Sequence, residues 1–486
     1  MFNRQEFLTW FQESGGWYNK DLVDLVPFPG MGYGAIAMND IPEDEPLFHI
    51  PDDLILSPFS SDLKNRLSRM EWNHLAHGWA QLILVMMWET IKGPKSRWSA
   101  YLANMPQNFD TPMFWSEDEK TGLSGTDIEL RIGKEEAELE YKNTVLPIIQ
   151  AHTELFPIDS PHTTIEAFHI QGSRILSRSF TVPTSHFGSK SSNEGSDDEE
   201  DDVAVMIPFA DMLNAACGKD NAHLFMDELS PQHSAKGVSM RTTKIVEKSK
   251  QIFNTYDSPP NSELLRKYGH VDVLPLPSPL LALLEPSEID IWPYGNPADE
   301  VLLPGDLIVN CVAKELDDKA DESWEGDVQE RIDWWLEEGQ DDVFPLSLSP
   351  SLDTNLISFI RLLLYDNEWQ KAKKKGKFPR SAVDDTVASI LIRAVQQRLG
   401  QYKNNIRDNL NSLQTFLAMS SQENSLKEPW ELPQTRAFCA TVVKLGEQRS
   451  LHLAARTIPQ AKNTNDDSKK RKIQSSLTRG MNKRLS

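Results

Sequence analysis

Two segments with the pattern of short strands and tight turns lie far apart in the chain. Residues 26–51 alternate short apolar runs with Gly, Pro and Asp, and residues 203–213 and 237–257 repeat this pattern. Between about Asp52 and Thr181 the apolar residues follow helical spacing instead. The sequence therefore predicts a β domain whose strands are separated in the chain by a helical insert.

The same patterns divide the rest of the chain. Ser, Gly and acidic residues dominate one segment, which cannot bury enough apolar surface to order itself, and a proline-rich stretch precedes a second helical region. The predicted segments are 1–51 (N-terminal helix and first part of the β domain), 52–184 (helical insert), 185–202 (acidic disordered loop), 203–273 (second part of the β domain), 274–326 (linker), 327–461 (helical domain) and 462–486 (basic disordered tail).

Length and charge restrict the fold and the partners. A chain of 486 residues is too long for one ordinary core, so two or three packed units are expected. It carries 72 acidic and 50 basic residues, a net charge of −22. This charge repels nucleic acid and attracts basic partners, although it also serves solubility alone. No direct binding of nucleic acid is expected.

The three cysteines, Cys217, Cys311 and Cys439, are widely spaced, with no CxxC pair and no nearby His cluster of metal-ligand spacing. A reducing compartment and no metal site are expected. No stretch of about 18 apolar residues and no signal-peptide pattern occurs, which predicts a soluble intracellular protein that does not enter a membrane.

A glycine cluster, Gly30 to Gly34 (GMGYG), is the first motif with chemical meaning. Closely spaced glycines let a backbone approach a ligand, as in dinucleotide-binding and class I methyltransferase folds. Such a loop must open directly into a helix, whereas AIAMNDIPEDEP follows here, with Pro42 and turn residues. A strand and a turn are therefore expected, and the dinucleotide-binding interpretation is disfavoured.

Two later motifs are weak when taken singly. The apolar run MIPFADMLN ends at Asn214, and a residue of this type is often an ordinary turn former. Tyr256 ends the strand-like run QIFNTY, and Tyr268 follows a short helix; tyrosines in such places are usually core residues.

Taken in order, the motifs are more specific. The segments GYGAIAMNDIPEDEPLFHIP, WSAYLANMPQNFDTPMFW, SRILSRSF, IPFADMLN and IFNTYDSPPNSELLRKYG resemble successive elements of the SET-domain family, in its Rubisco-methyltransferase-like branch. The acidic loop and the helical C-terminal region resemble the subgroup of fungal ribosomal lysine methyltransferases and their animal nuclear relatives. The resemblance implies an α+β chain, with a SET-domain β fold split by a helical insert and followed by an α-helical C-terminal substrate-binding domain.

The resemblance also implies an activity, the transfer of a methyl group from S-adenosyl-L-methionine to the ε-amine of a protein lysine. Cofactor-binding roles then fall on Gly32, Tyr33, Gly34, Arg178, Asn214 and Tyr268. Phe180 and Asp211 are expected on the substrate side, and Tyr256 takes the position of the catalytic tyrosine.

The expected chemistry is consistent with these residue types. A lysine amine has an unperturbed pKa of about 10.4 and must lose a proton before it can attack a methyl group. A dry channel and a neighbouring sulfonium both lower that pKa, so no strong protein base is required. The remaining task is alignment of the amine, which the Tyr256 hydroxyl is expected to perform.

One position departs from the family pattern. Many members of this branch have His immediately after the Asn of the ADMLN-type motif, whereas this chain has Ala215. A SET-fold nuclear binding module without turnover therefore stays open. Methylation of histidine instead of lysine also stays open, because a relative in this broad branch methylates histidine.

The partner and the location rest mainly on the subgroup resemblance. A basic protein substrate is expected, specifically a large-subunit ribosomal protein, with histones or other nuclear proteins as the alternative; the protein is expected to be a monomer. The run KKRK at residues 469–472 is typical either of a solvated tail or of a nuclear import signal, and we expect the nucleus, with the cytoplasm also open. Trp334 and Trp335 are adjacent on a predicted helix and are not expected to face one groove.

Overall fold

The computed structural model describes residues 3–28, 31–187, 202–227, 236–255, 257–284, 292–316, 322–421 and 435–458. The chain divides into two compact units. Unit 1 consists of Met1–Phe114, Gly133–Ser258 and Lys267–Gly269, and unit 2 of Trp115–Ile132, Pro259–Arg266 and His270–Ser486. Three predicted features lie outside the described residues: Tyr256, residues 188–201 of the acidic loop, and the basic tail 462–486.

Unit 1 carries the strands of the predicted β domain. One sheet has the order β1-β4-β8-β7, a second the order β2-β3-β9, and β5 pairs with β6. The strands are β1 (Trp17–Tyr18), β2 (Val23–Phe28), β3 (Gly32–Ala37), β4 (Pro46–Pro51), β5 (Ser179–Pro183), β6 (Asp202–Met206), β7 (Ala222–Asp227), β8 (Gly237–Thr242) and β9 (Gln251–Ile252). All pairings between described strands are antiparallel, which excludes a dinucleotide-binding fold built on a parallel sheet.

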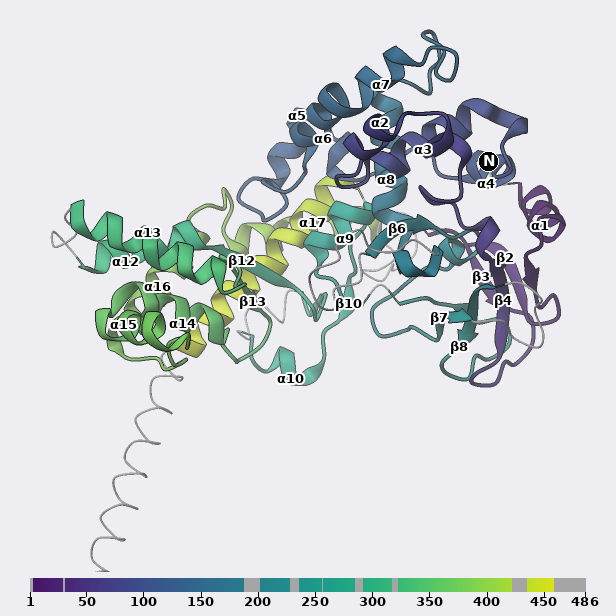
Figure 1. The fold of residues 1–486 in the computed structure, drawn as a ribbon. Helices are drawn as coiled ribbons and strands as arrows, with labels where there is room; N and C mark the ends of the chain where they lie inside the picture. Colours follow the sequence, from purple (N-terminus) through teal and green to yellow (C-terminus); the bar gives the residue numbers. More distant parts are fainter. Residues whose placement is uncertain are drawn as a thin grey trace, which may run out of the picture. The chain divides into compact units, whose positions relative to one another are not determined.

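The helices of unit 1 gather on one side of these strands (Figure 1). They are α1 (Arg4–Glu13), α2 (Arg69–His74), α3 (Ala80–Lys92), α4 (Ser99–Asn104), α6 (Lys134–Glu140), α7 (Leu146–Ala151) and α8 (Ile165–Arg178), with a π-helical turn at Tyr141–Val145. Every residue from Leu82 to Glu89 in α3 is buried, because this segment is almost wholly apolar. The predicted helical insert differs at its end, where β-branched Thr181 and Val182 form part of β5 opposite β6.

Phe209 lies at the centre of an aromatic cluster in unit 1. Its ring centroid is 4.4 Å from that of Phe48, 5.1 Å from Phe11 and 5.5 Å from Tyr18. The backbone of Phe209 has a positive φ of 77°, a conformation that costs a bulky L residue about 1–3 kcal/mol. The buried rings stabilise this bend, which sets the path of residues 210–214.

Unit 2 is mostly helical. Its helices are α5 (Glu117–Lys120), α9 (Asn261–Tyr268, of which Lys267 and Tyr268 belong to unit 1), α10 (Ser278–Leu281), α12 (Gly305–Leu316), α13 (Glu322–Glu337), α14 (Thr354–Leu364), α15 (Asp366–Lys375), α16 (Asp385–Leu399) and α17 (Ile406–Ser421). Short antiparallel ribbons pair β10 (Leu274–Pro275) with β11 (Tyr294–Gly295) and β12 (Glu300–Pro304) with β13 (Val343–Ser347).

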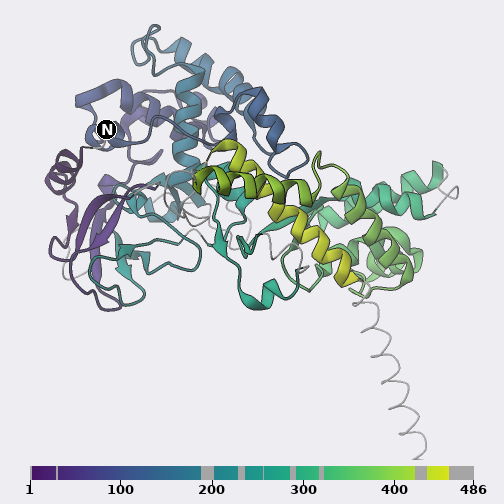
Figure 2. The same ribbon diagram turned by 180° about the vertical axis from the view of Figure 1, so that it is seen from behind.

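The helical residues 436–458, yellow in Figure 2, bring buried polar side chains into unit 2. Gln448 donates to the Asn404 carbonyl, Arg449 to the carbonyls of Trp292 and Tyr294, and Ser450 to the Asp299 carbonyl. Gly446 lies against Asp299, so closely that a Cβ there would overlap the carboxylate. Unit 2 is therefore held together by polar contacts as well as by apolar packing.

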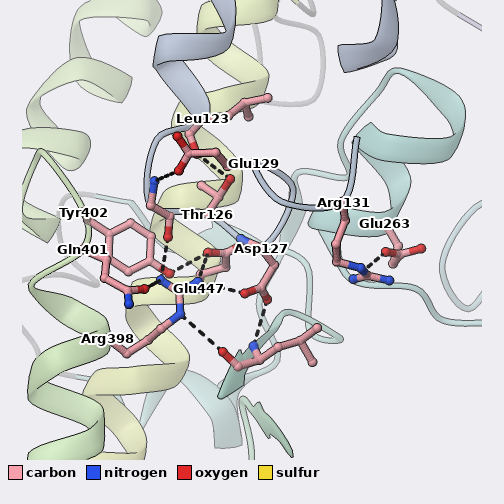
Figure 3. Close-up of polar contacts among 12 residues, drawn as sticks. Leu123, Thr126, Asp127, Glu129, Arg131, Glu263, Arg398, Gln401, Tyr402 and Glu447 are labelled. Atoms are coloured by element: carbon pink, nitrogen blue, oxygen red, sulfur yellow. Dashed lines mark hydrogen bonds and ion pairs between the residues drawn. The ribbon is translucent and has the colours of Figure 1, made fainter. Parts of the chain in front are cut away.

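A second polar cluster in unit 2 surrounds Arg398 of α16 (Figure 3). Its Nη2 contacts Asp127 Oδ1 at 2.8 Å and Glu447 Oε2 at 3.5 Å, and the Tyr402 hydroxyl donates to Glu447 Oε2 at 2.5 Å. The Asp127 amide donates to Glu447 Oε1 at 3.1 Å. Burial raises the pKa of both carboxyl groups, while Arg398 lowers it.

The predicted linker, residues 274–326, forms regular structure in its described parts, 274–284, 292–316 and 322–326. It contains β12 and α12, and Val301, Leu303, Ile308 and Cys311 belong to the same core as α14 and α16. Its prolines suggested a boundary, but Pro304 lies at the junction of β12 and α12, where a missing amide N–H is tolerated. The prediction of a linker was therefore wrong for the described part of this segment.

Trp334 and Trp335 also differ from expectation. Their ring centroids lie 5.5 Å and 5.3 Å from that of Phe378. The two adjacent tryptophans of α13 therefore contact one and the same ring. Phe378 follows α15, and its ring packs against Trp334 in a tilted and against Trp335 in an edge-to-face arrangement.

In the described ranges, each helix is either too short or too polar to span a bilayer.

Candidate functional site

Strand β3 presents a glycine to the interior of unit 1. Gly34 pairs with Val26 of β2, and its neighbour Ala35 pairs with Ile252 of β9, so the strand is held on both sides. A Cβ built on Gly34 would lie 2.5 Å from Asn214 Nδ2 and 2.8 Å from Gln251 Nε2. Only glycine therefore leaves the two amide side chains in place.

Both of these amide nitrogens are buried donors. Asn214 Nδ2 and Gln251 Nε2 make no hydrogen bond to any residue in the described ranges. An unmade hydrogen bond of this kind costs about 1–3 kcal/mol, so a folded protein rarely leaves two of them together without a ligand. The pair thus forms a cradle next to the β3 backbone for a ligand that carries oxygen or nitrogen acceptors.

Hydrogen bonds to the segment around β9 position Asn214. The Asn254 amide donates to the Asn214 carbonyl at 3.0 Å, which ties the end of the 207–214 segment to the residues after β9. Asn221 reinforces this contact, since its Oδ1 accepts from the Phe253 amide at 2.8 Å and its Nδ2 donates to the Gln251 carbonyl at 3.2 Å. The bend at Phe209 completes the path.

Asp211 lies three residues before Asn214 and is fully buried. Its Oδ2 accepts from the Tyr101 hydroxyl at 2.9 Å, and Arg178 Nη1 lies 3.7 Å from Oδ2 and donates to the Asp211 carbonyl at 2.8 Å. Asp211 Oδ1 has no hydrogen-bond partner within the part of the chain that the structure describes. Burial raises the pKa of Asp211 to about 6, although Arg178 and Tyr101 act in the opposite direction.

Arg178 and Phe180 come from adjacent elements. Arg178 is the last residue of α8, and Phe180 follows it in β5, paired with Val205 of β6. Both side chains are half-buried. The predicted residues Arg178 and Asp211 are thus brought into contact, while Phe180 lies on the ribbon that leads to them.

Gly32 and Tyr33 begin β3, opposite Phe28 and Pro27. Gly32 is exposed with a φ of 73°, and a Cβ there would meet no atom within 4 Å. Tyr268 is half-buried and precedes Gly269, whose φ of 78° and close approach to Asp110 fix the end of α9 within unit 1. Ala215 is half-buried directly after Asn214.

Two residues of this site were not predicted. Tyr101 lies on α4 in the WSAYLANMP segment, and burial together with Asp211 raises its pKa well above the ordinary range. Gln251 lies at the start of β9. Neither spacing nor residue type distinguishes them from ordinary core and strand residues; the one available signal was their place within the motifs.

Among the described residues, no group of three or more His, Cys, Asp or Glu side chains could hold a metal ion. The polar groups of the site are backbone groups, two amides, a guanidinium, the Tyr101 hydroxyl and one buried carboxyl.

Comparison with known families explains this arrangement. The family model described as "SET domain" matches residues 32–257, from the start of β3 to just past Tyr256. The chain carries a SET domain. The SET match covers most of both β segments and the insert between them, so the SET domain recognised from the order of the motifs is confirmed.

Curated relatives agree with the SET assignment. The chain is 31% identical over 250 residues to N-lysine methyltransferase SETD6 of Homo sapiens, covering 50% of this chain and 49% of that protein. It is 32% identical over 251 residues to ribosomal lysine N-methyltransferase 4 of Saccharomyces cerevisiae, covering 50% and 49%. The chain thus spans about half the length of these relatives, while an alignment at 26% identity spans 83% of the SETD6 protein of Rattus norvegicus.

Solved structures extend the likeness to most of the chain. A SET-domain structure of LSMT bound to lysine and AdoHcy has a TM-score of 0.63 at 19% identity, covering 96% of this chain and 92% of that one. Rubisco LSMT bound to AdoMet has a TM-score of 0.60 at 19% identity, covering 96% and 93%. At this identity the likeness shows the fold, and the predicted α+β class is confirmed.

Proposed function

We propose that this chain is an S-adenosyl-L-methionine-dependent protein-lysine N-methyltransferase. The observation that carries the proposal is the cradle at Gly34, which lies inside the segment matching the SET domain. The relatives named above are lysine methyltransferases, and the structural neighbours were determined with AdoMet or AdoHcy. The fold, the relatives and the unpartnered donors thus support one activity.

The residues present fit this cofactor. The β3 backbone at Gly32, Tyr33 and Gly34 would bind it edge-on, and the two buried amides at Asn214 and Gln251 would find acceptors in it. Arg178 and Tyr268 would line the pocket and close it. The bound cofactor supplies an electrophilic methyl group on a positively charged sulfur.

The chain's own residues then prepare the lysine. The target amine must be neutral to attack, and a water-excluding channel lowers its pKa. Tyr256 would orient the amine through its hydroxyl, with Phe180 and Asp211 on the substrate side. Because Asp211 is buried and hydrogen-bonded by Tyr101, it would hold the Arg178 side chain in place and would not itself accept the lysine proton.

Radiolabel transfer tests the activity. The full chain with tritiated S-adenosylmethionine should label a lysine in protein extract, and Tyr256→Phe should lower turnover by about 100-fold or more. A matched control is Tyr141→Phe. It removes a hydroxyl that donates to the Thr163 carbonyl at 2.6 Å and does not contact the cradle residues. Cofactor binding without any methyl transfer would favour the binding module, the alternative that Ala215 raises. Labelled methylhistidine would identify a histidine methyltransferase.

For the substrate, we propose a large-subunit ribosomal protein. The support is the name of the yeast relative and the net charge of −22, which suits a basic protein. Mass spectrometry of ribosomal proteins from cells lacking this chain should show one lysine site that loses methylation. An unchanged ribosomal methylome together with a lost site on a histone or another nuclear protein would transfer the proposal to that class.

For the location, we propose the nucleus, on the basis of residues 469–472. A fluorescent fusion should accumulate there, and replacement of the four basic residues by alanine should distribute it through the cell. Equal distribution of both fusions would contradict a role for this run in import.

A further inference from the structure

Unit 2 contains a dense basic segment. Six cations occur within ten residues at the end of α15 and directly after it, and all are exposed. They are Lys371, Lys373, Lys374, Lys375, Lys377 and Arg380. In a chain of net charge −22, such a local excess of positive charge calls for a physical reason.

Neighbouring acids do not neutralise this segment. Lys373 pairs with Glu330, but the other five cations form no ion pair with any residue that the structure describes. The two acids of α15 are already engaged, Asp366 by Arg331 and Glu368 by Arg361. Five positive charges are therefore available to a partner.

The helix dipole explains only part of the cluster. Lys373, Lys374 and Lys375 occupy the last turn of α15, where cations are favoured by about 0.3–1 kcal/mol. Gly376, with a φ of 57°, ends the helix. Lys377 and Arg380 lie beyond it and gain nothing from the dipole.

An aromatic residue stands among these cations in the chain. Phe378 is 40% exposed, between Lys377 and Arg380 in the chain. Its inner side packs on Trp334 and Trp335, at centroid distances of 5.5 Å and 5.3 Å, so the ring is held rigidly. Lys373 lies 5.2 Å from the ring centroid of Trp369, which contacts Trp334 in turn. The surface thus combines a fixed, partly exposed ring with five unpaired cations.

We propose that residues 371–380 bind single-stranded nucleic acid, with phosphates on the lysines and an unpaired base stacked on Phe378. Proteins that bind single strands combine a basic track with exposed aromatic rings in this way. An acidic segment without aromatic residues would use the same cations but leave the ring without a partner, whereas each nucleotide of a single strand brings a phosphate and a planar base, so the observations favour nucleic acid. This revises the expectation drawn from net charge, because at physiological salt charges beyond about 8 Å are screened and the local field decides.

The binding test uses the full chain and a fluorescein-labelled oligouridylate of about 12 nucleotides, followed by fluorescence anisotropy at 50 and 200 mM salt. The variant Lys374→Ser/Lys375→Ser/Lys377→Ser should weaken binding at least tenfold and reduce the slope of log K against log salt by about 2, near 0.7 for each cation lost. Phe378→Ala should weaken binding about fivefold or more and leave the salt slope unchanged, since stacking is uncharged.

A matched control removes three exposed cations from unit 1, as Lys64→Ser/Arg66→Ser/Arg69→Ser. It should bind within about twofold of wild type. The proposal is overturned if wild type does not bind at 50 mM salt, if both triple variants lose affinity equally, or if a polyglutamate peptide of equal charge displaces the oligonucleotide at equal concentration. The last outcome would identify an acidic protein segment as the partner.

Discussion

Gly34 meets two separate requirements. It continues β3 between two partner strands, and it leaves the space in which Asn214 and Gln251 present their amides. A side chain at this position would fill the cradle before any ligand could.

Gly34→Ala should therefore weaken binding of S-adenosylmethionine more than it weakens the fold. We expect at least a tenfold rise in Kd by isothermal titration, because the new methyl group displaces both amides. Gly172→Ala is the control, since a Cβ there would lie 3.7 Å from Ile83 Cδ1, an ordinary contact inside α8. Equal affinity in both variants would show that the cradle does not hold the cofactor.

Asp211 should make the stability of unit 1 depend on pH. Its pKa rises from 3.8 to about 6 on folding, so the folded state binds the proton more tightly than the unfolded state. The contribution of this group is thus fully present below pH 3.8 and is lost as pH rises to about 6, by up to about 3 kcal/mol.

Asp211→Asn removes this loss, so the variant should show a flatter profile of unfolding free energy between pH 4 and 6. Hydrogen exchange of unit 1 amides measures it, and Asp53→Asn, at an exposed position, should leave the profile unchanged. Tyr101→Phe should move the transition to higher pH, because Tyr101 lowers the pKa of Asp211. A profile identical in wild type and Asp211→Asn would mean that the carboxyl titrates normally.

At the residue scale, the order of motifs singled out residues that the structure brings together. Arg178 and Asp211 were singled out separately and lie in contact, and Asn214 lies against Gly34. Tyr101 and Gln251 could not be found in this way, because a buried hydroxyl and a strand amide are distinguished only by partners that are distant in sequence, here Asp211 and Gly34.

Among the elements, the helical residues 436–458 contain an exception to helix propensity. Gly446 lies in the middle of the helix, where alanine would ordinarily be better by about 1 kcal/mol. The Asp299 carboxylate occupies the space that a Cβ needs, and burial raises the pKa of Asp299 to about 7.

Gly446→Ala should therefore destabilise unit 2 by about 2 kcal/mol or more in urea unfolding, in spite of its helix propensity. The control is Gly122→Ala in the same unit, where a Cβ would lie 3.5 Å from that of Ala440. A stabilised Gly446→Ala variant would show that Asp299 can move away at little cost.

The prediction of helices and strands succeeded where the sequence pattern allowed one interpretation only. The apolar run of α3 can only be a buried helix or a membrane span, and it is too short for the latter. The prediction of a linker was wrong because its prolines were interpreted as a domain boundary. Pro304 instead joins strand β12 to helix α12, within the core that contains Val301 and Ile308.

For the whole molecule, the cluster around Arg398 is the clearest test of how unit 2 is held together. Arg398→Met leaves Asp127 and Glu447 buried without their cation, which should cost about 3–5 kcal/mol at neutral pH. Because Arg398 lowers both pKa values, its loss raises them further, so both carboxyls are protonated in mild acid and the penalty should shrink there.

Denaturant unfolding at pH 7.5 and 5 measures this difference. Arg393→Met, in the same helix but in a partly exposed pair with Glu315, should cost less than about 1 kcal/mol at both pH values. If Arg398→Met lost the same unfolding free energy at both pH values, the loss would not come from buried carboxylates without a cation.

The division of the whole chain was only partly predictable. Composition indicated two or three packed units, but residues 115–132 were expected within the insert and instead belong to unit 2. The reason lies in side chains that no local pattern exposes: Trp115, Leu123 and Ile128 share a core with Phe438 and Val442, over 300 residues later.

That core also determines which parts of the chain can be buried early and which late during synthesis. The described strands of unit 1 have all been synthesised once residue 252 is made, whereas the core that Trp115 and Leu123 share is complete only after residues 436–458. At about 5–20 residues per second this interval lasts tens of seconds. Throughout it the nascent chain displays apolar side chains from its own middle, which makes the 115–132 segment the place where a chaperone has most to protect.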